Sequence, residues 1–216
     1  MNGPGTVAAD SHQDESRDRA IDPVSGHPEA IDPLALALEW LPVNDEPERP
    51  QMTLSTVDAE GGPDARTLLL SRADETGFWF HTNAQSRKIQ QLAADPRVAL
   101  TLLWPGFTRQ LIIRGVAELA TAENIAATFA ARSPYLQQLA VHSTTGFAQL
   151  PRAQRLEQWA AFADENPAGF EQSESWTGYL VRPTRLTFWT GDVEASSHRT
   201  EYELVNGGWS RSYLAG

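Results

Sequence analysis

Apolar and polar residues alternate along much of the chain with the two-residue period of half-buried strands, and turn residues separate the alternating segments. The first segment, QMTLSTVD, ends in the turn AEGGPD. The second, ARTLLLSR, ends in the turn ADETG, and the third is FWFHT. We interpret residues 51–82 as a meander of three antiparallel strands. Two longer strands, rich in β-branched residues and leucine, are expected at 97–104 and 109–120 around the tight turn PGFT.

Helical patterns interrupt the strands in three places. DPLALALEWL predicts a helix capped by Asp32, SRKIQQLAADP predicts a helix that Pro96 ends, and a helical block follows between residues 121 and 165, with Thr121 and Ser133 as further caps. The chain then returns to strands. Four are expected, and the NGG before the last of them favours a hairpin: 176–183, 185–191, 201–205 and 209–214.

These patterns predict a mainly β chain with helices, an antiparallel α+β barrel. We expect residues 31–216 to form a single domain, because no linker divides them. Residues 1–30 are rich in Gly, Pro, Asp, Ser and Glu, and we interpret them as a flexible N-terminal tail.

Composition narrows the function classes. The 28 acidic side chains exceed the 17 basic ones, and the net charge of −11 argues against nucleic acid or an acidic membrane surface as a partner. The chain has no cysteine, and its five histidines show no metal-ligand spacing, so we expect no metal site. The N-terminal segment lacks the apolar region of a secretory signal and no apolar run reaches the length of a membrane span, so we expect a cytoplasmic protein.

One short stretch, Ser86 to Lys88, places a hydroxyl, a guanidinium and an ammonium at the expected start of a helix. Free backbone amides and the helix dipole favour an anion there, although a solvated first helical turn explains the same residues. Arg66 lies one hairpin away and can converge on this stretch. Gln110 interrupts an apolar strand, and its amide can offer a donor and an acceptor to a heterocycle.

Six motifs in order, RTLLLS, GFWFHTNAQSRK, DPRVALTLLW, RQLIIRG, WTGYLVRP and LTFWTG, make the chain resemble the pyridoxamine 5'-phosphate oxidase family. The resemblance runs from about residue 34 to the C-terminus. It implies an FMN-binding split β-barrel and a homodimer with FMN at the subunit interface. By position, Trp189 and Arg199 match residues that reach the flavin from the second subunit. A Gln-Ser pair of the family is replaced here by Thr145-Gly146, which puts that contact in doubt.

The cofactor residues that the resemblance implies bind the FMN phosphate, run along the flavin or contact its ring. The full set is Arg66, Thr67, Leu68, Leu69, His81, Thr82, Ser86, Arg87, Lys88, Gln110, Trp189 and Arg199.

The substrate side departs from the family. Of the four residues that anchor the substrate phosphate in the family, only Arg132 remains, because the Lys position is Ser71, the Tyr position is Thr128 and the Ser position is Leu136. An Arg and a His over the substrate ring are replaced as well, by Ala195 and Ser197.

Losing two or three hydrogen bonds to a charged group weakens binding by roughly 3–9 kcal/mol. Arg72 follows Ser71 directly, but adjacent strand side chains point to opposite faces. We therefore name Arg132, His198 and Ser71 as the candidate substrate contacts.

We expect an FMN-dependent oxidoreductase that transfers a hydride from a small, less anionic substrate to flavin N5, with reoxidation by oxygen and no certain catalytic side chain. Three alternatives stay open. The first is a genuine pyridoxamine or pyridoxine 5'-phosphate oxidase of vitamin B6 metabolism with an altered pocket. The second is a non-catalytic flavin- or haem-binding split barrel, with His81 or His142 as the axial ligand. The third is a relative that uses deazaflavin.

Overall fold

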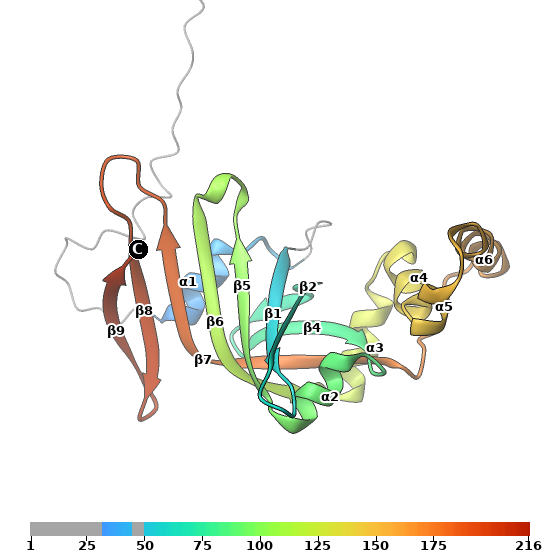
Figure 1. Ribbon diagram of the computed structural model, residues 1–216, viewed down its shortest axis with the longest axis horizontal. Helices are drawn as coiled ribbons and strands as arrows, with labels where there is room; N and C mark the ends of the chain where they lie inside the picture. Colours follow the sequence, from blue (N-terminus) through green and yellow to red (C-terminus); the bar gives the residue numbers. More distant parts are fainter. Residues whose placement is uncertain (1–31, 45–49) are drawn as a thin grey trace, which may run out of the picture. The chain divides into compact units, whose positions relative to one another are not determined.

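The strands form one antiparallel sheet in the computed structural model, which describes residues 32–44 and 50–216. The order is β2-β1-β5-β6-β7-β4-β3, and β8 pairs with β7 and β9 (Figure 1). Their bounds are β1 (Gln51–Val57), β2 (Pro63–Leu69), β3 (Arg72–Asp74), β4 (Gly77–Asn83), β5 (Arg97–Leu103), β6 (Arg109–Leu119), β7 (Trp176–Thr190), β8 (His198–Val205) and β9 (Gly208–Ala215). The expected α+β class and antiparallel pairing are confirmed.

One predicted strand divides in two, and the expected three-strand meander is wrong. β2 ends at Leu69 and pairs only with β1, whereas β3 begins at Arg72 and pairs with β4. Between them the buried Leu70 donates its amide to the carbonyl of Pro50, and Ser71 donates to the carbonyl of Trp79, so the chain changes its partner strand here. β2 and β4 therefore do not pair, although they still contact each other.

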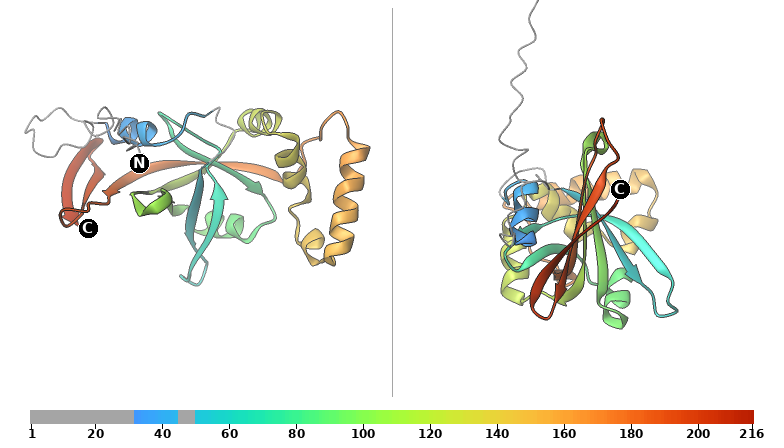
Figure 2. Two further views of the ribbon diagram at one scale, coloured as in Figure 1. Left: turned by 90° about the horizontal axis from the view of Figure 1, so that it is seen from above. Right: turned by 90° about the vertical axis from the view of Figure 1, so that its left-hand side faces the viewer.

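Two other predicted strands are one. Residues 176–183 and 185–191 join in β7, which pairs with β6 from Tyr179 to Thr190 and with β4 and β8 on its other edge (Figure 2). The register shifts opposite Gly115, which leaves Thr184 as an extra residue of β7. Because a bulge accommodates a proline without a ladder hydrogen bond, Pro183 does not end the strand.

The helices begin where the cap signals predict. Asp32 Oδ1 accepts the amide of Leu34 at 2.9 Å, and the hydroxyl groups of Thr121 and Ser133 cap two further helices. The helices are α1 (Pro33–Trp40), α2 (Arg87–Ala94), α3 (Ala122–Ala130), α4 (Pro134–His142), α5 (Thr145–Gln149) and α6 (Arg152–Glu165), with a short 3-10 turn, η2 (Pro105–Phe107), between β5 and β6. In the part of the chain described, no helix is long and apolar enough to cross a membrane.

The core lies on one face of the sheet. Leu54, Leu100, Leu111, Ile113 and Leu186 are fully buried there and come from four neighbouring strands. Their neighbours along each strand are half-buried or exposed, as the period of two requires, except for the buried Thr187. The predicted tail, residues 1–30, lies outside the described residues, so its assignment stays a prediction.

Candidate functional site

The predicted cofactor residues fall into separate groups, and the first lies around the start of α2. Arg66 comes from β2, Thr82 from β4, and Ser86 to Lys88 from the N-terminal end of α2. We call Arg66, Ser86, Arg87 and Lys88 the basic cluster. The expectation that the strand carrying Arg66 and the start of this helix converge is confirmed, because Arg66 hydrogen-bonds a residue of α2.

Arg66 is held by a network of hydrogen bonds. Its Nη1 donates to Thr56 Oγ1 at 2.7 Å and to the carbonyl of Leu54 at 3.4 Å. Its Nη2 donates to Gln91 Oε1 at 2.8 Å and to Asp64 Oδ2 at 2.7 Å. Thr56 and Gln91 are buried and hydrogen-bond each other, so they fix the guanidinium from the protein side.

The N-terminus of α2 leaves a hydroxyl group free. Ser86 is the N-cap residue, but its side chain accepts no capping hydrogen bond. Its Oγ is buried and has no hydrogen-bond partner among the described residues. A buried hydroxyl without a partner is costly, so this atom and the free amides of the first turn suit an anionic ligand.

Two further cations complete the cluster. Lys88 is half-buried, its Nζ donates to Thr82 Oγ1 at 3.0 Å, and burial, with Arg66 nearby, lowers the pKa of its ammonium. Arg87 is 79% exposed, and its Nε lies 3.8 Å from Asp64 Oδ2. Two guanidinium groups, an ammonium and a hydroxyl are the donor set that recognises a phosphate.

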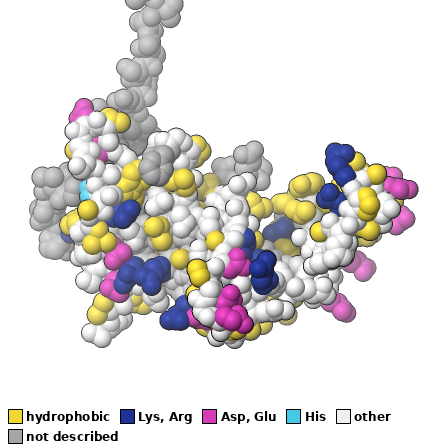
Figure 3. All heavy atoms as spheres, in the orientation of Figure 1, with side chains coloured by type: hydrophobic (Ala, Val, Ile, Leu, Met, Phe, Trp, Pro, Cys, Tyr) yellow, Lys and Arg dark blue, Asp and Glu magenta, His cyan; other side chains and the backbone are white. Residues whose placement is uncertain are grey.

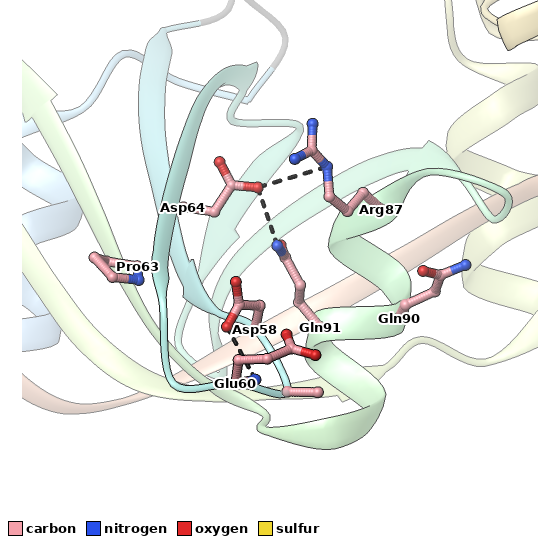
Figure 4. A pocket seen from close by; sticks show the side chains of 8 residues that line it. Asp58, Glu60, Pro63, Asp64, Arg87, Gln90 and Gln91 are labelled. Carbon is pink, nitrogen blue, oxygen red and sulfur yellow. Dashed lines mark hydrogen bonds and ion pairs between the residues drawn. The ribbon is translucent and has the colours of Figure 1, made fainter.

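The cluster borders a pocket of about 440 Å³ between the β1–β2 turn and α2. Figure 4 shows Asp64 facing Arg87 and Gln91, which both come from α2, with Asp58 and Glu60 on the turn below. Figure 3 shows acidic and basic side chains side by side over this part of the surface. The chain has therefore placed carboxylates next to its basic cluster.

A second group forms a row across three strands. Gln110 on β6 pairs with Trp189 on β7, and Trp189 pairs with Arg199 on β8, so the three share one face of the sheet. The indole Nε1 of Trp189 donates to Ser197 Oγ at 2.9 Å. Arg199 Nε is buried and finds no hydrogen-bond partner in the described part of the chain. His198, the neighbouring residue, is exposed.

His81 lies away from the basic cluster. Adjacent residues of a strand point to opposite faces, and Thr82 takes the face of Lys88. The His81 ring instead stacks on Trp176 with centroids 5.4 Å apart, and Arg132 lies over the same indole at 4.3 Å. Burial, with Arg132 and Arg72 nearby, lowers the pKa of His81 to about 4.

The candidate substrate residues come from three different segments: Arg132 lies between α3 and α4, Ser71 between β2 and β3, and His198 at the start of β8. The guanidinium of Arg132 lies over the ring of Trp176. Burial lowers the pKa of Arg132 to about 10, so this side chain is charged at neutral pH. Ser71 Oγ is buried and without a hydrogen-bond partner among residues 32–44 and 50–216. Arg72 does not replace the missing lysine, because its guanidinium pairs with Asp74 and lies over Trp79.

The residues expected along the flavin divide between two faces. Leu68 pairs with buried Met52, whereas Thr67 and Leu69 pair with Thr53 and Gln51 on the opposite face. Thr145 and Gly146, the doubtful contact, are exposed at the start of α5.

Sequence reasoning missed three members of the Arg66 network: Thr56, Asp64 and Gln91. Two signals were available. Asp64 precedes Arg66 by two residues and therefore shares its face of the strand. Gln91 follows Arg87 by four residues and lies on the same side of the helix.

Comparison with known proteins gives a consistent result. Residues 43–165 match the family model for pyridoxamine 5'-phosphate oxidase. Residues 176–216 match the model for the pyridoxine 5'-phosphate oxidase C-terminal dimerisation region. The chain belongs to the pyridoxamine 5'-phosphate oxidase family. It is an FMN-dependent oxidase with the split-barrel fold of that family, and the expectations of fold, enzyme class and cofactor are confirmed.

Relatives within the family are similar over nearly their whole length. Pyridoxine/pyridoxamine 5'-phosphate oxidase of Pseudomonas paraeruginosa is 38% identical over 198 residues, 85% of this chain and 88% of the relative. The enzyme of the same name from Pseudomonas syringae pv. tomato is 35% identical over 96% of this chain and 97% of its own.

Among solved structures, PhzG of Burkholderia lata, in complex with tetrahydrophenazine-1-carboxylic acid, superposes with a TM-score of 0.77 at 21% identity. The alignment covers 91% of this chain and 98% of that one. Because the identity is low, this likeness shows the fold alone.

Proposed function

We propose that this member of the pyridoxamine 5'-phosphate oxidase family oxidises pyridoxine or pyridoxamine 5'-phosphate. One observation carries the proposal: relatives of that name are 35–38% identical over 85% or more of the chain. This outweighs the loss of individual substrate contacts, because a phosphate can be held by donors other than those of the family pattern.

The basic cluster is the proposed site of the FMN phosphate. A phosphate fits the Ser86 Oγ, which has no partner among the described residues, and the half-buried Lys88. Arg66 and Arg87 add two guanidinium groups. When bound, FMN supplies a ring that accepts a hydride and is reoxidised. The chain itself supplies position and charge. We place the His81 ring outside this phosphate site, because it stacks on Trp176.

Within the row across β6, β7 and β8, Trp189 and Arg199 are proposed to contact the flavin that the partner subunit binds. Trp189 and Arg199 both lie within residues 176–216, the matched dimerisation region. The buried Arg199 Nε, which lacks a partner in the described ranges, is a donor that a ligand at a subunit interface can use. We therefore propose a homodimer in which each FMN lies between Arg66 to Lys88 of one subunit and Trp189 and Arg199 of the other.

Arg132 is the proposed anchor for the substrate phosphate. Its guanidinium is held against Trp176 by a cation–π contact, and it forms no ion pair with a carboxylate of residues 32–44 or 50–216. His81, which stacks on the same indole, is uncharged at neutral pH because its pKa is about 4. It therefore does not add to the positive charge around the substrate.

A second candidate is the same oxidation of a substrate without a phosphate. A specific observation favours it: Ser71, Thr128 and Leu136 stand where the family has three of its four phosphate anchors. Leu136 places an apolar side chain at the position of one of these anchors.

One experiment separates the candidates. The protein is loaded with FMN and mixed without oxygen with pyridoxamine 5'-phosphate or with pyridoxamine, and the flavin absorbance is followed. We expect the phosphorylated substrate to bleach the flavin and to give hydrogen peroxide when oxygen is readmitted. If pyridoxamine bleaches the flavin and pyridoxamine 5'-phosphate does not, the second candidate is supported. If neither compound bleaches the flavin, the proposal is contradicted.

A further inference from the structure

A carboxylate lies in the middle of the basic cluster. Asp64 Oδ2 accepts from Arg66 Nη2 at 2.7 Å and from Gln91 Nε2 at 3.0 Å, and it lies 3.8 Å from Arg87 Nε. One oxygen atom thus faces two of the four side chains proposed to bind the FMN phosphate, Arg66 and Arg87. Figure 4 shows its contacts with Arg87 and Gln91.

This carboxylate occupies donors that a phosphate needs. Leu54, Thr56, Gln91 and Asp64 together take four hydrogen bonds from Nη1 and Nη2 of Arg66, which is the number of terminal N–H groups that a guanidinium has. A phosphate oxygen can reach these atoms only by displacing a partner or by sharing its hydrogen.

Asp64 is the partner that can be displaced. Thr56 and Gln91 are 3% and 4% exposed and hydrogen-bond each other, so they are fixed in the core. The side chain of Asp64 is 28% exposed and lies on the rim of the pocket beside the cluster. Arg66 keeps three acceptors without Asp64, so its orientation does not depend on the carboxylate.

Asp64 is also ionised at neutral pH, where the basic cluster is positively charged. The hydrogen bond from Gln91, with Arg66 and Arg87 nearby, holds the pKa of Asp64 below its usual range. Its field reaches Lys88, where it opposes the lowering of the lysine pKa. A phosphate bound to these cations therefore meets a fixed negative charge at close range.

We propose that Asp64 competes with the FMN phosphate for Arg66 and Arg87 and so reduces the preference of the site for FMN over riboflavin, which lacks the phosphate. This inference rests on the proposed position of FMN. It makes Asp64 a specificity-determining residue of the cofactor site. The chain tolerates it because Ser86, Lys88 and the amides of α2 remain available to the phosphate.

The test is the variant Asp64→Asn, which keeps the shape and the hydrogen-bonding oxygen but removes the charge. Apoprotein is titrated with FMN and with riboflavin, and the quenching of flavin fluorescence gives each dissociation constant. We expect FMN to bind about three- to tenfold more tightly to the variant, and riboflavin to bind as it does to the original chain. The gain should shrink at high salt, because the charge lies near solvent.

Asp95→Asn is the matched control. Asp95 also pairs with the arginine two residues after it, Arg97, but it lies at the C-terminal cap of α2. The eight residues of α2 separate it from Ser86 by about 12 Å along the axis. We expect both dissociation constants of this variant to stay unchanged.

The results distinguish a failure of the inference about Asp64 from a failure of the proposed FMN site. Weaker or unchanged FMN binding by Asp64→Asn, or equal gains for FMN and riboflavin, would overturn the competition. The variant Lys88→Ala reports on the site itself: if it binds FMN as the original chain does, the phosphate lies elsewhere and the proposed cofactor site fails. If Lys88→Ala loses FMN while Asp64→Asn changes nothing, only the role of Asp64 fails.

Discussion

Ser86 and Thr121 occupy the same position, the N-cap, in two helices, but their hydroxyl groups have different partners. Thr121 accepts the amide of Asn124 at 3.2 Å, whereas Ser86 Oγ is buried and unpartnered within the described chain. We therefore expect Ser86→Ala to change the free energy of unfolding of the apoprotein by less than about 0.5 kcal/mol and to weaken FMN binding about tenfold or more. Thr121→Ala should cost about 1 kcal/mol of stability and leave FMN binding unchanged. Denaturant unfolding and flavin titration measure both quantities, and a stability loss in Ser86→Ala as large as in Thr121→Ala would contradict the distinction.

The buried residue His81 predicts that the stability of the protein depends on pH. Burial lowers its pKa from the usual 6.5 to about 4, so the unfolded chain binds a proton more readily than the folded one between these values. The stability that neutral His81 contributes is present above pH 6.5 and is lost as the pH falls toward 4, by up to about 3 kcal/mol. Between pH 7 and 4.5, His81→Phe should lose less stability than the original chain by about this amount. If the free energies of unfolding of the two proteins fall by the same amount between pH 7 and 4.5, folding does not lower the pKa of His81.

At the scale of the element, β7 depends on a close approach at its bulge. A Cβ atom on Gly115 would lie 2.1 Å from the carbonyl oxygen of Arg182, which is backbone and cannot rotate away. We expect Gly115→Ala to destabilise the protein by about 2–4 kcal/mol, because β6 and β7 must separate to accept the methyl group. Gly146→Ala is the control, since nothing lies within 4 Å of its Cβ position in α5. Thermal unfolding compares the two, and similar melting temperatures would show that the bulge is not tight.

The same strand shows where sequence patterns mislead. Pro183 ended a predicted strand because proline lacks the donor that a ladder needs. It does not end β7, because the shift of register opposite Gly115 lets the strand continue. In contrast, the hairpin at NGG was predictable from local chemistry alone: Asn206 and Gly207 both adopt a positive φ, which a tight hairpin turn requires.

At the scale of the whole molecule, the proposed sharing of each FMN between two subunits has a test. Arg66→Ala with Lys88→Ala damages the half-site of one subunit, and Trp189→Ala with Arg199→Ala damages the half contributed by the other. Each doubly substituted homodimer should bind FMN poorly. A purified heterodimer of the two should bind about one FMN per dimer, because one of its two sites combines both intact halves. Absorbance at saturation gives the stoichiometry. A heterodimer without tight sites would mean that each FMN lies within a single chain.

The local sequence by itself determined the helix caps, most strand positions, the hairpin turn and the residue types of the basic cluster, because these follow from short-range chemistry and periodicity. Only the tertiary structure decided how the strands pair and which side chains meet. The change of partner between β2 and β3 and the continuity of β7 depend on contacts between distant segments. The same long-range packing brought Gln91 and Thr56 to Arg66 and placed Asp64 among the arginines. The residues near Arg66 in the sequence do not indicate which helix Arg66 contacts.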